Sequence, residues 1–89
     1  MFAMKNPDPE ILRSAIFEII HNQIRDNNPP ETKATLERLL ADEIPEEEAL
    51  KMIGCCVTTE IFDILKYHRT FDEARYVRNL HRLPQLPWE

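Results

Sequence analysis

Glycine is almost missing from this chain of 89 residues, where it occurs once, at Gly54, against seven prolines. A single glycine cannot build the glycine-rich loops that hold phosphates in nucleotide-binding folds. The prolines stand at the edges of periodic segments, a placement typical of the breaks between helices. No segment combines the alternating apolar pattern and the two-residue turns of a β-hairpin. We therefore predict an all-α protein without a nucleotide-binding loop.

Long apolar runs are also missing. No uninterrupted apolar segment approaches the roughly 20 residues that a transmembrane helix needs. The first residues, Met1 to Pro7, lack the apolar stretch of a secretory signal. We therefore expect a soluble, cytoplasmic protein with no role in a membrane.

Cysteine is scarce, and its two positions, Cys55 and Cys56, are adjacent. Neighbours on a helix point about 100° apart, so these two thiols are poorly placed to pair with each other. A redox or zinc role would need a C-x-x-C spacing or further ligands at suitable intervals, and the sequence has neither. We expect both thiols to be reduced and structural.

A basic surplus is lacking as well. Eleven Lys and Arg against sixteen Asp and Glu give a net charge of −5, whereas nucleic-acid binding depends on cations that contact phosphate. Residues 1–49 hold five cations and eleven anions, while residues 50–89 hold six and five. Nucleic acid is therefore a disfavoured partner, and the acidic and basic parts could face each other within one chain or between two.

Helix-start signals divide the chain into four predicted helices, two long and two short. Proline near the first position, with acidic residues in the first turn, marks most of these starts, and Asp8 and Asn28 are the predicted N-caps of the first and second helices. The predicted helices cover 8–26, 29–42, 45–67 and 70–81, and a proline-rich extended arm covers 83–89. The chain is too short for a second core. We predict one domain over residues 1–89, a compact bundle of four helices with an extended C-terminal arm.

Leu65 and Ala74 are expected to face inward, Arg38 to face water and Trp88 to lie across the helices. Gly54, in the middle of the third helix, is expected to mark the close approach of another helix.

The sequence resembles a family of small prokaryotic all-helical domains with no assigned function. The resemblance spans Pro7 to Pro84 and rests on these segments: Asn22-Gln23-Ile24, Asn28-Pro29-Pro30-Glu31-Thr32, Glu37-Arg38-Leu39, Glu47-Glu48-Ala49, Ile53-Gly54, Phe71-Asp72, Arg75-Tyr76 and Leu83-Pro84. It implies an all-α fold, a prokaryotic origin and a cytoplasmic setting. In that family a histidine often takes the position of Phe17, which implies that any polar site there is altered in this chain.

Three polar residues occupy positions where the helical pattern favours apolar ones: Gln23, Glu60 and His68. A buried carboxylate needs a cation or hydrogen-bond donors. The favoured interpretation is a paired polar contact that fixes helix register. A polar patch in a groove for a ligand or partner is the alternative. We expect no catalytic residue, because no nucleophile with a neighbouring base is apparent.

Glu18 and His21 form a single E-x-x-H unit. Di-iron bundles use this unit twice, together with two further glutamates. Both residues fall on the polar strip of the first helix with Ser14 and Arg25. We therefore predict no metal and no cofactor, and a metal-dependent enzyme is the remotest of the functions considered.

Two features bear on partners. Phe62 falls on the otherwise polar side of the third predicted helix, and the first helix is apolar around about two-thirds of its circumference. Exposed apolar patches usually mark association sites, so the favoured function is a non-enzymatic interaction or structural module that forms a homodimer. An arm folded back over the same surface is the competing explanation. The alternative function is binding of an anionic ligand or nucleic acid through residues 66–82, where Arg75, Arg78 and Arg82 share a face.

Overall fold

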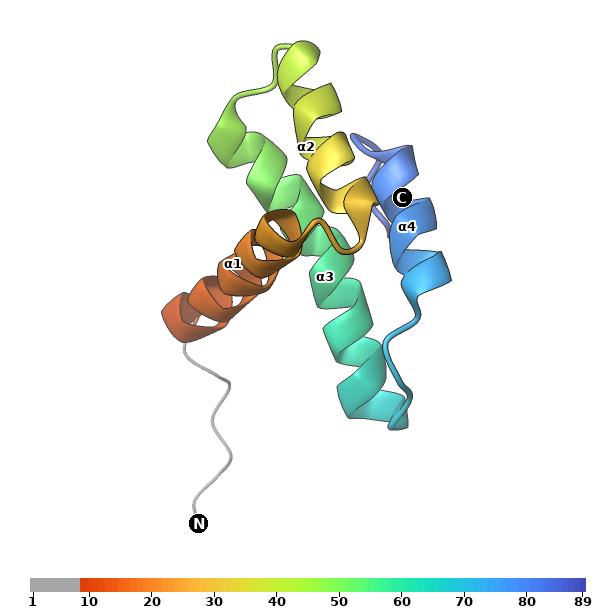
Figure 1. The fold of residues 1–89 in the computed structure, drawn as a ribbon. Helices are drawn as coiled ribbons and strands as arrows, with labels where there is room; N and C mark the ends of the chain where they lie inside the picture. Colours follow the sequence, from red (N-terminus) through yellow and green to blue (C-terminus); the bar gives the residue numbers. More distant parts are fainter. Residues whose placement is uncertain (1–8) are drawn as a thin grey trace.

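The computed structural model describes residues 9–89, and within this range every regular element is an α-helix. The helices are α1 (Pro9–Asp26), α2 (Pro30–Ala41), α3 (Glu46–Tyr67) and α4 (Glu73–Arg82) (Figure 1). The predictions of an all-α chain and of two long and two short helices are confirmed. None of the four helices is at once long enough and apolar enough to cross a bilayer.

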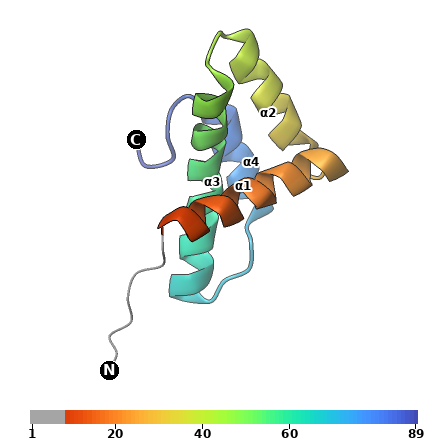
Figure 2. The same ribbon diagram turned by 90° about the vertical axis from the view of Figure 1, so that its left-hand side faces the viewer.

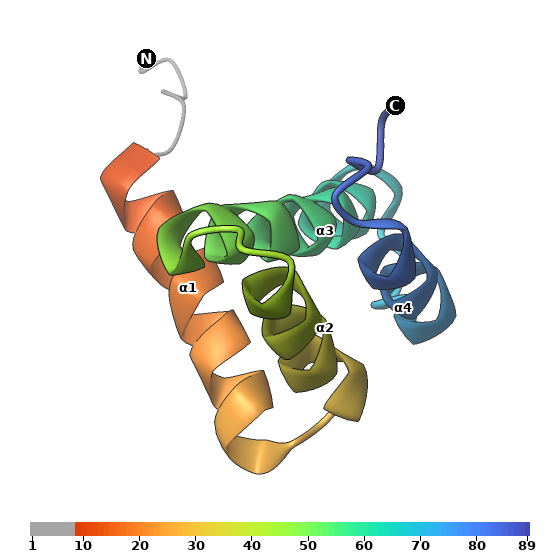
Figure 3. The ribbon, with the colours of Figure 1, turned by 90° about the horizontal axis from the view of Figure 1, so that it is seen from above.

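Helix α3 contacts the other three helices and organises the fold. Helix α1 runs across α3 rather than along it (Figure 2). Seen from above, α1, α2 and α4 follow one another along α3 (Figure 3), and α2 contacts both of its neighbours in this row. The core between the helices consists of ten buried apolar residues: Ile16, Ile20, Leu39, Ala49, Ile53, Cys56, Val57, Tyr76, Leu80 and Leu83.

The single glycine lies where α1 crosses α3. Gly54 is buried, and a Cβ atom built on it would lie 3.3 Å from Cγ2 of Ile16. Glycine in a helix interior costs about 1 kcal/mol relative to alanine. The close approach of α1 accounts for a residue that α3 alone would not favour, as the sequence predicts.

Two helix starts differ from the predicted ones. Helix α2 begins at Pro30, its N-cap is Pro29 and no side chain caps it, so the prediction of Asn28 as its cap is wrong. Helix α4 begins at Glu73 rather than at residue 70. Its N-cap is Asp72, whose Oδ1 accepts a 3.0 Å bond from the backbone N–H of Arg75. The predicted cap of the first helix, Asp8, lies outside the described residues.

Polar residues take core positions that the sequence pattern assigns to apolar ones. On α4 the buried residues are Tyr76, Asn79 and Leu80, whereas Ala74, predicted to face inward, is exposed. On α2 they are Thr32, Thr35 and Leu39, and Leu40 is exposed. An apolar pattern cannot reveal a position such as Thr32, whose hydroxyl bonds to Gln23 on another helix.

The segment after α4 packs on its own chain at its beginning. Leu83 is buried and Leu86 packs against the core. The segment is not extended throughout, because bonds from Gln85 N–H to Arg82 O (2.9 Å) and from Glu89 N–H to Leu86 O (3.0 Å) close turns. Trp88, expected to lie across the helices, is 66% exposed.

Candidate functional site

The most buried charge in the described chain is Glu60, in the middle of the C-terminal half of α3. Its carboxylate accepts bonds from Arg75 Nε at 2.7 Å and Arg75 Nη2 at 3.1 Å. The backbone N–H of Asp72 donates a third bond, at 3.0 Å. Glu60 therefore joins α3 both to α4 and to the loop that precedes it.

Arg75 also lies 3.2 Å from the carboxylate of Asp63, one turn further along α3. The hydrogen bonds to Glu60 and Asp63 raise the pKa of Arg75, and its guanidinium stays charged. Arg69 approaches the same Asp63 at 3.8 Å. The ion pairs thus form a small network that holds the loop between α3 and α4, and its geometry is that of a structural contact.

A second cluster of polar side chains joins α1, α2 and α4. Oε1 of Gln23 on α1 accepts bonds from the hydroxyls of Thr32 on α2 (2.7 Å) and Tyr76 on α4 (2.8 Å). The two hydroxyls lie 3.2 Å apart. Burial raises the pKa of Tyr76 to about 12, so the phenol stays protonated and can donate. The backbones of α1 and α4 are not in contact, and Gln23 with Tyr76 provides their link.

The three predicted polar core residues are not one group. Gln23 and Glu60 belong to the two separate networks just described. His68 is exposed and takes the left-handed conformation (φ 56°) at the C-cap of α3, so its assignment to the core face is wrong. The predicted helix ends at Tyr67, as α3 does, so the helical spacing does not carry over to residue 68.

The predicted arginine stripe is also divided. Arg75 is engaged by the carboxylates of Glu60 and Asp63, so it is not free to hold an external anion. Arg78 and Arg82 are exposed, and Arg82 Nη2 donates to Glu89 O at 3.4 Å. Only two of the three cations therefore face solvent.

Arg38 is a partner that sequence reasoning missed. It lies on the face of α2 expected to be solvated, yet it is half-buried. Its guanidinium donates to Leu83 O at 2.9 Å and to Leu80 O at 3.0 Å. These carbonyls end α4, so Arg38 caps that helix from α2. No sequence signal distinguishes this arginine from a solvated one.

The exposed side of α3 carries large apolar side chains. Phe62 is 64% exposed and Leu65 is 69% exposed. Leu65 was expected to face inward, and that expectation is wrong. The residues on this side follow the alternating four-and-three spacing of a coiled-coil seam, and we call them the α3 seam: Lys51, Cys55, Thr58, Phe62 and Leu65. Its first and last members are exposed, and Cys55 and Thr58 are half-buried.

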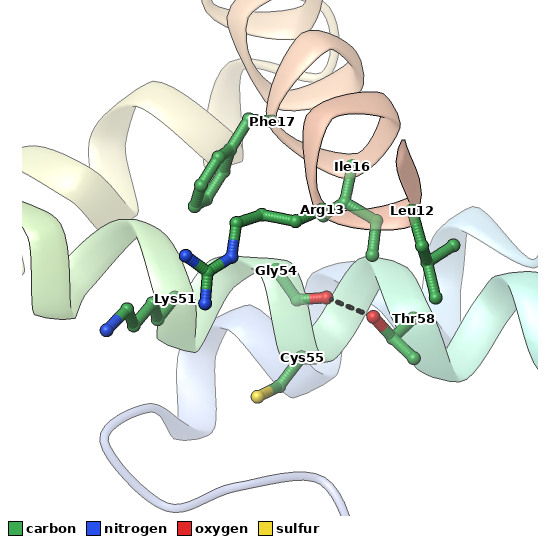
Figure 4. Close-up of a pocket in the computed structure, with 8 residues that line it drawn as sticks. All are labelled: Leu12, Arg13, Ile16, Phe17, Lys51, Gly54, Cys55 and Thr58. Carbon is green, nitrogen blue, oxygen red and sulfur yellow. Dashed lines mark hydrogen bonds between the residues drawn. The ribbon is translucent and has the colours of Figure 1, made fainter. Parts of the chain in front are cut away.

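The N-terminal half of the α3 seam borders a groove between α1 and α3. The groove is mostly apolar and has a volume of about 240 Å³. Figure 4 shows its lining residues: Leu12, Arg13, Ile16, Phe17, Lys51, Gly54, Cys55 and Thr58. The guanidinium of Arg13 extends over the groove (Figure 4), while Lys51 forms a 3.8 Å ion pair with Glu47. The groove is an open apolar surface with cations at its rim.

The two thiols differ in accessibility. Cys55 is half-buried beside the groove, whereas Cys56 is buried in the core. Burial raises the pKa of Cys55, and burial together with the neighbouring Cys55 and Glu60 raises that of Cys56 to about 12. Both thiols therefore stay protonated, and this environment suits packing rather than nucleophilic attack.

Glu18 and His21 are both exposed on α1, on the polar side where the sequence places them. Among residues 9–89 no three His, Cys, Asp or Glu side chains lie close enough together to hold a metal ion. The E-x-x-H unit therefore stands without further ligands in this part of the chain.

Comparison with known proteins finds no matching family model, no similar curated protein and no similar solved structure. The resemblance to a prokaryotic helical family accordingly stays a prediction, and functional inference rests on the surface of the molecule.

Proposed function

We propose that this chain is a non-enzymatic interaction module that self-associates through the α3 seam. The observation that carries the proposal is the exposure of Phe62 and Leu65, both above 60%, on one side of a long helix. Large apolar side chains at coiled-coil spacing are typical of a helix that packs against another helix. The proposal places a homodimer of compact helical domains in the cytoplasm.

The C-terminal segment, residues 83–89, does not cover the α3 seam. If residues 83–89 folded back over this surface, Phe62 would be buried, but it is exposed, and Trp88 is exposed too. Leu83, at the start of the segment, is instead buried and bonded through its carbonyl to Arg38 on α2. This supports a second chain over the folded-back arm as the occupant of the α3 seam.

Both interior networks, one ionic and one neutral, support a structural rather than a catalytic role for the interior. The carboxylate of Glu60 and Oε1 of Gln23 accept hydrogen bonds from partners within the chain. In residues 9–89 no buried side-chain nitrogen or oxygen lacks a hydrogen-bond partner. A binding or catalytic site that awaits a ligand commonly leaves such a group unpaired.

The alternative function, binding of an anion or nucleic acid through residues 66–82, has less support. Arg75 is held by Glu60 and Asp63, which leaves Arg78 and Arg82 as the exposed pair of the stripe. Loss of affinity for a heparin column on changing both to Ala, with the dimer intact, would favour this alternative.

Light scattering coupled to gel filtration tests the proposal with two matched variants. Phe62→Ser and Trp88→Ser each remove an aromatic side chain of nearly equal exposure, 64% and 66%. Burying a Phe side chain contributes about 1.5–3 kcal/mol, and a two-fold dimer contains two copies. We therefore expect Phe62→Ser to weaken the dimer at least about a hundredfold, while Trp88→Ser leaves it unchanged. Dimers of equal affinity in the two variants would contradict the proposal.

A further inference from the structure

The groove beside α1 is large enough for an aromatic ring. Its volume is about 240 Å³ and its lining is mostly apolar. An apolar cavity of roughly 150 Å³ binds benzene, so a phenyl ring fits within this groove. The guanidinium of Arg13 extends over the same space (Figure 4) and could lie against the face of such a ring as a cation–π pair.

The chain cannot fill this groove with its own Phe62. Phe62 follows Cys55, a lining residue, by seven positions on the same helix. Seven residues of α-helix span about 10 Å, and the ring is 64% exposed. A ring from Phe62 can therefore reach the groove only from another molecule.

The charges at the two ends of α3 favour an antiparallel neighbour. The helix begins with three acidic residues, Glu46 to Glu48, and carries Lys66 in its last turn, with Arg69 just beyond it. Two parallel copies would set like charges together, whereas antiparallel copies set acidic start against basic end. An isologous contact of this kind obeys a two-fold axis.

The middle of the α3 seam, at Thr58 and the adjacent Thr59, suits a close crossing. Thr58 and Thr59 donate their hydroxyl hydrogens to Gly54 O (2.8 Å) and Cys55 O (3.0 Å) within their own helix. Because these hydroxyls are already satisfied, burying them against a second helix strands no polar group. Both side chains are small, so two helices can approach closely at this point.

We infer that two copies pack their α3 helices antiparallel about a two-fold axis at Thr58 and Thr59, and that each seats its Phe62 in the α1–α3 groove of the other. With the axis midway between these threonines, Phe62 faces Cys55 of the second copy, and Glu48 in the first turn of α3 lies toward the C-terminal end of the second copy's α3, where Lys66 and Arg69 stand. The smallest member of the α3 seam thus meets the largest, and an acid meets a base. This inference rests on the proposed self-association and specifies its geometry.

Cross-linking tests the orientation. Chains with Glu48→Cys and chains with Arg69→Cys are mixed, treated with a short bismaleimide, and the linked peptides are identified by mass spectrometry. The antiparallel arrangement predicts links between position 48 of one chain and position 69 of the other. Links of 48 to 48 and of 69 to 69, in a protein that still sediments as a dimer, would overturn the inference and leave the proposed function standing.

Alkylation of the native Cys55 tests the seating of Phe62. The rate of reaction with iodoacetamide should fall at least tenfold as the protein concentration rises through the dimerisation range, and it should stay constant in the Phe62→Ser variant. A dimer whose Cys55 reacts at the monomer rate would overturn the inference. Protection of Cys55 in a monomer would also overturn it, because the chain itself would then cover the groove. A protein that never dimerises would refute the proposed function as well.

Discussion

Replacing Glu60 with alanine is the sharpest test of the interior. The change removes three hydrogen bonds: two from Arg75 and one from the backbone N–H of Asp72. Bonds to charged groups contribute roughly 1.5–3 kcal/mol each, but the loss is smaller than their sum. Arg75 keeps Asp63 at 3.2 Å and is partly exposed. We therefore expect the free energy of unfolding to fall by about 2–3 kcal/mol.

Removing the cation should cost more than removing the anion. Arg75→Ala leaves Glu60 fully buried without its counter-charge, and breaking a buried pair in this way costs about 3–5 kcal/mol. Urea unfolding followed by circular dichroism, at one fixed protein concentration, measures both variants. Glu47→Ala is the control, since Glu47 is an exposed glutamate on the same helix and its loss should change stability by less than about 0.5 kcal/mol. A change in Glu60→Ala as small as the control, or a smaller loss in Arg75→Ala than in Glu60→Ala, would refute the reasoning.

Three further predictions concern packing and pH. Tyr76→Phe removes the hydroxyl that donates to Gln23, so unfolding measurements should show a loss of about 1–2 kcal/mol; an unchanged stability would contradict this. Gly54→Val pushes carbon atoms toward Ile16, already 3.3 Å from a Cβ at this position, and should cost about 1–3 kcal/mol; a more stable variant would show that α1 yields readily. Burial raises the pKa of Cys56 from 9.0 and that of Tyr76 from 10.0, each to about 12. Both groups ionise first in the unfolded chain, so they leave stability unaffected below about pH 8 and should lower it as the pH rises from about 9 to about 12; a flat profile across that range would be inconsistent with their burial.

Sequence patterns predicted the helices well because helix ends are local events. Proline and acidic residues near the starts of α2 and α3 fix those starts to within one residue of the predicted positions. Gly54 likewise predicted a close helix crossing, which Ile16 provides. These signals depend on the backbone and on nearest neighbours, which a sequence displays directly.

Sequence patterns failed where a residue's role depends on a distant partner. Tyr76 is buried because Gln23, 53 residues earlier, accepts its hydroxyl hydrogen, and no apolar periodicity reveals that. Arg75 was placed in a solvent-facing stripe because its spacing matches Arg78, yet Glu60 binds it from another helix. The sequence alone does not state which carboxylate meets which cation.

The sequence also does not identify the α3 seam as the open side of its helix. Its spacing, from Lys51 to Leu65, is visible in the sequence, but other apolar residues of α3 mask it by filling the opposite side of the helix. Phe62 stood out only because Thr58 and Lys66, one turn away on the same side of the helix, are polar. The position of α1 across Gly54 decides which apolar side of α3 is covered and which remains open (Figure 2).

Sedimentation equilibrium of the unaltered chain tests the central claim most directly. The chain mass is 10.6 kDa, so association through the α3 seam predicts a weight-average mass that rises toward twice this value as the concentration increases. A mass that stays at 10.6 kDa up to hundreds of micromolar, with Phe62 still open to solvent, would contradict the account.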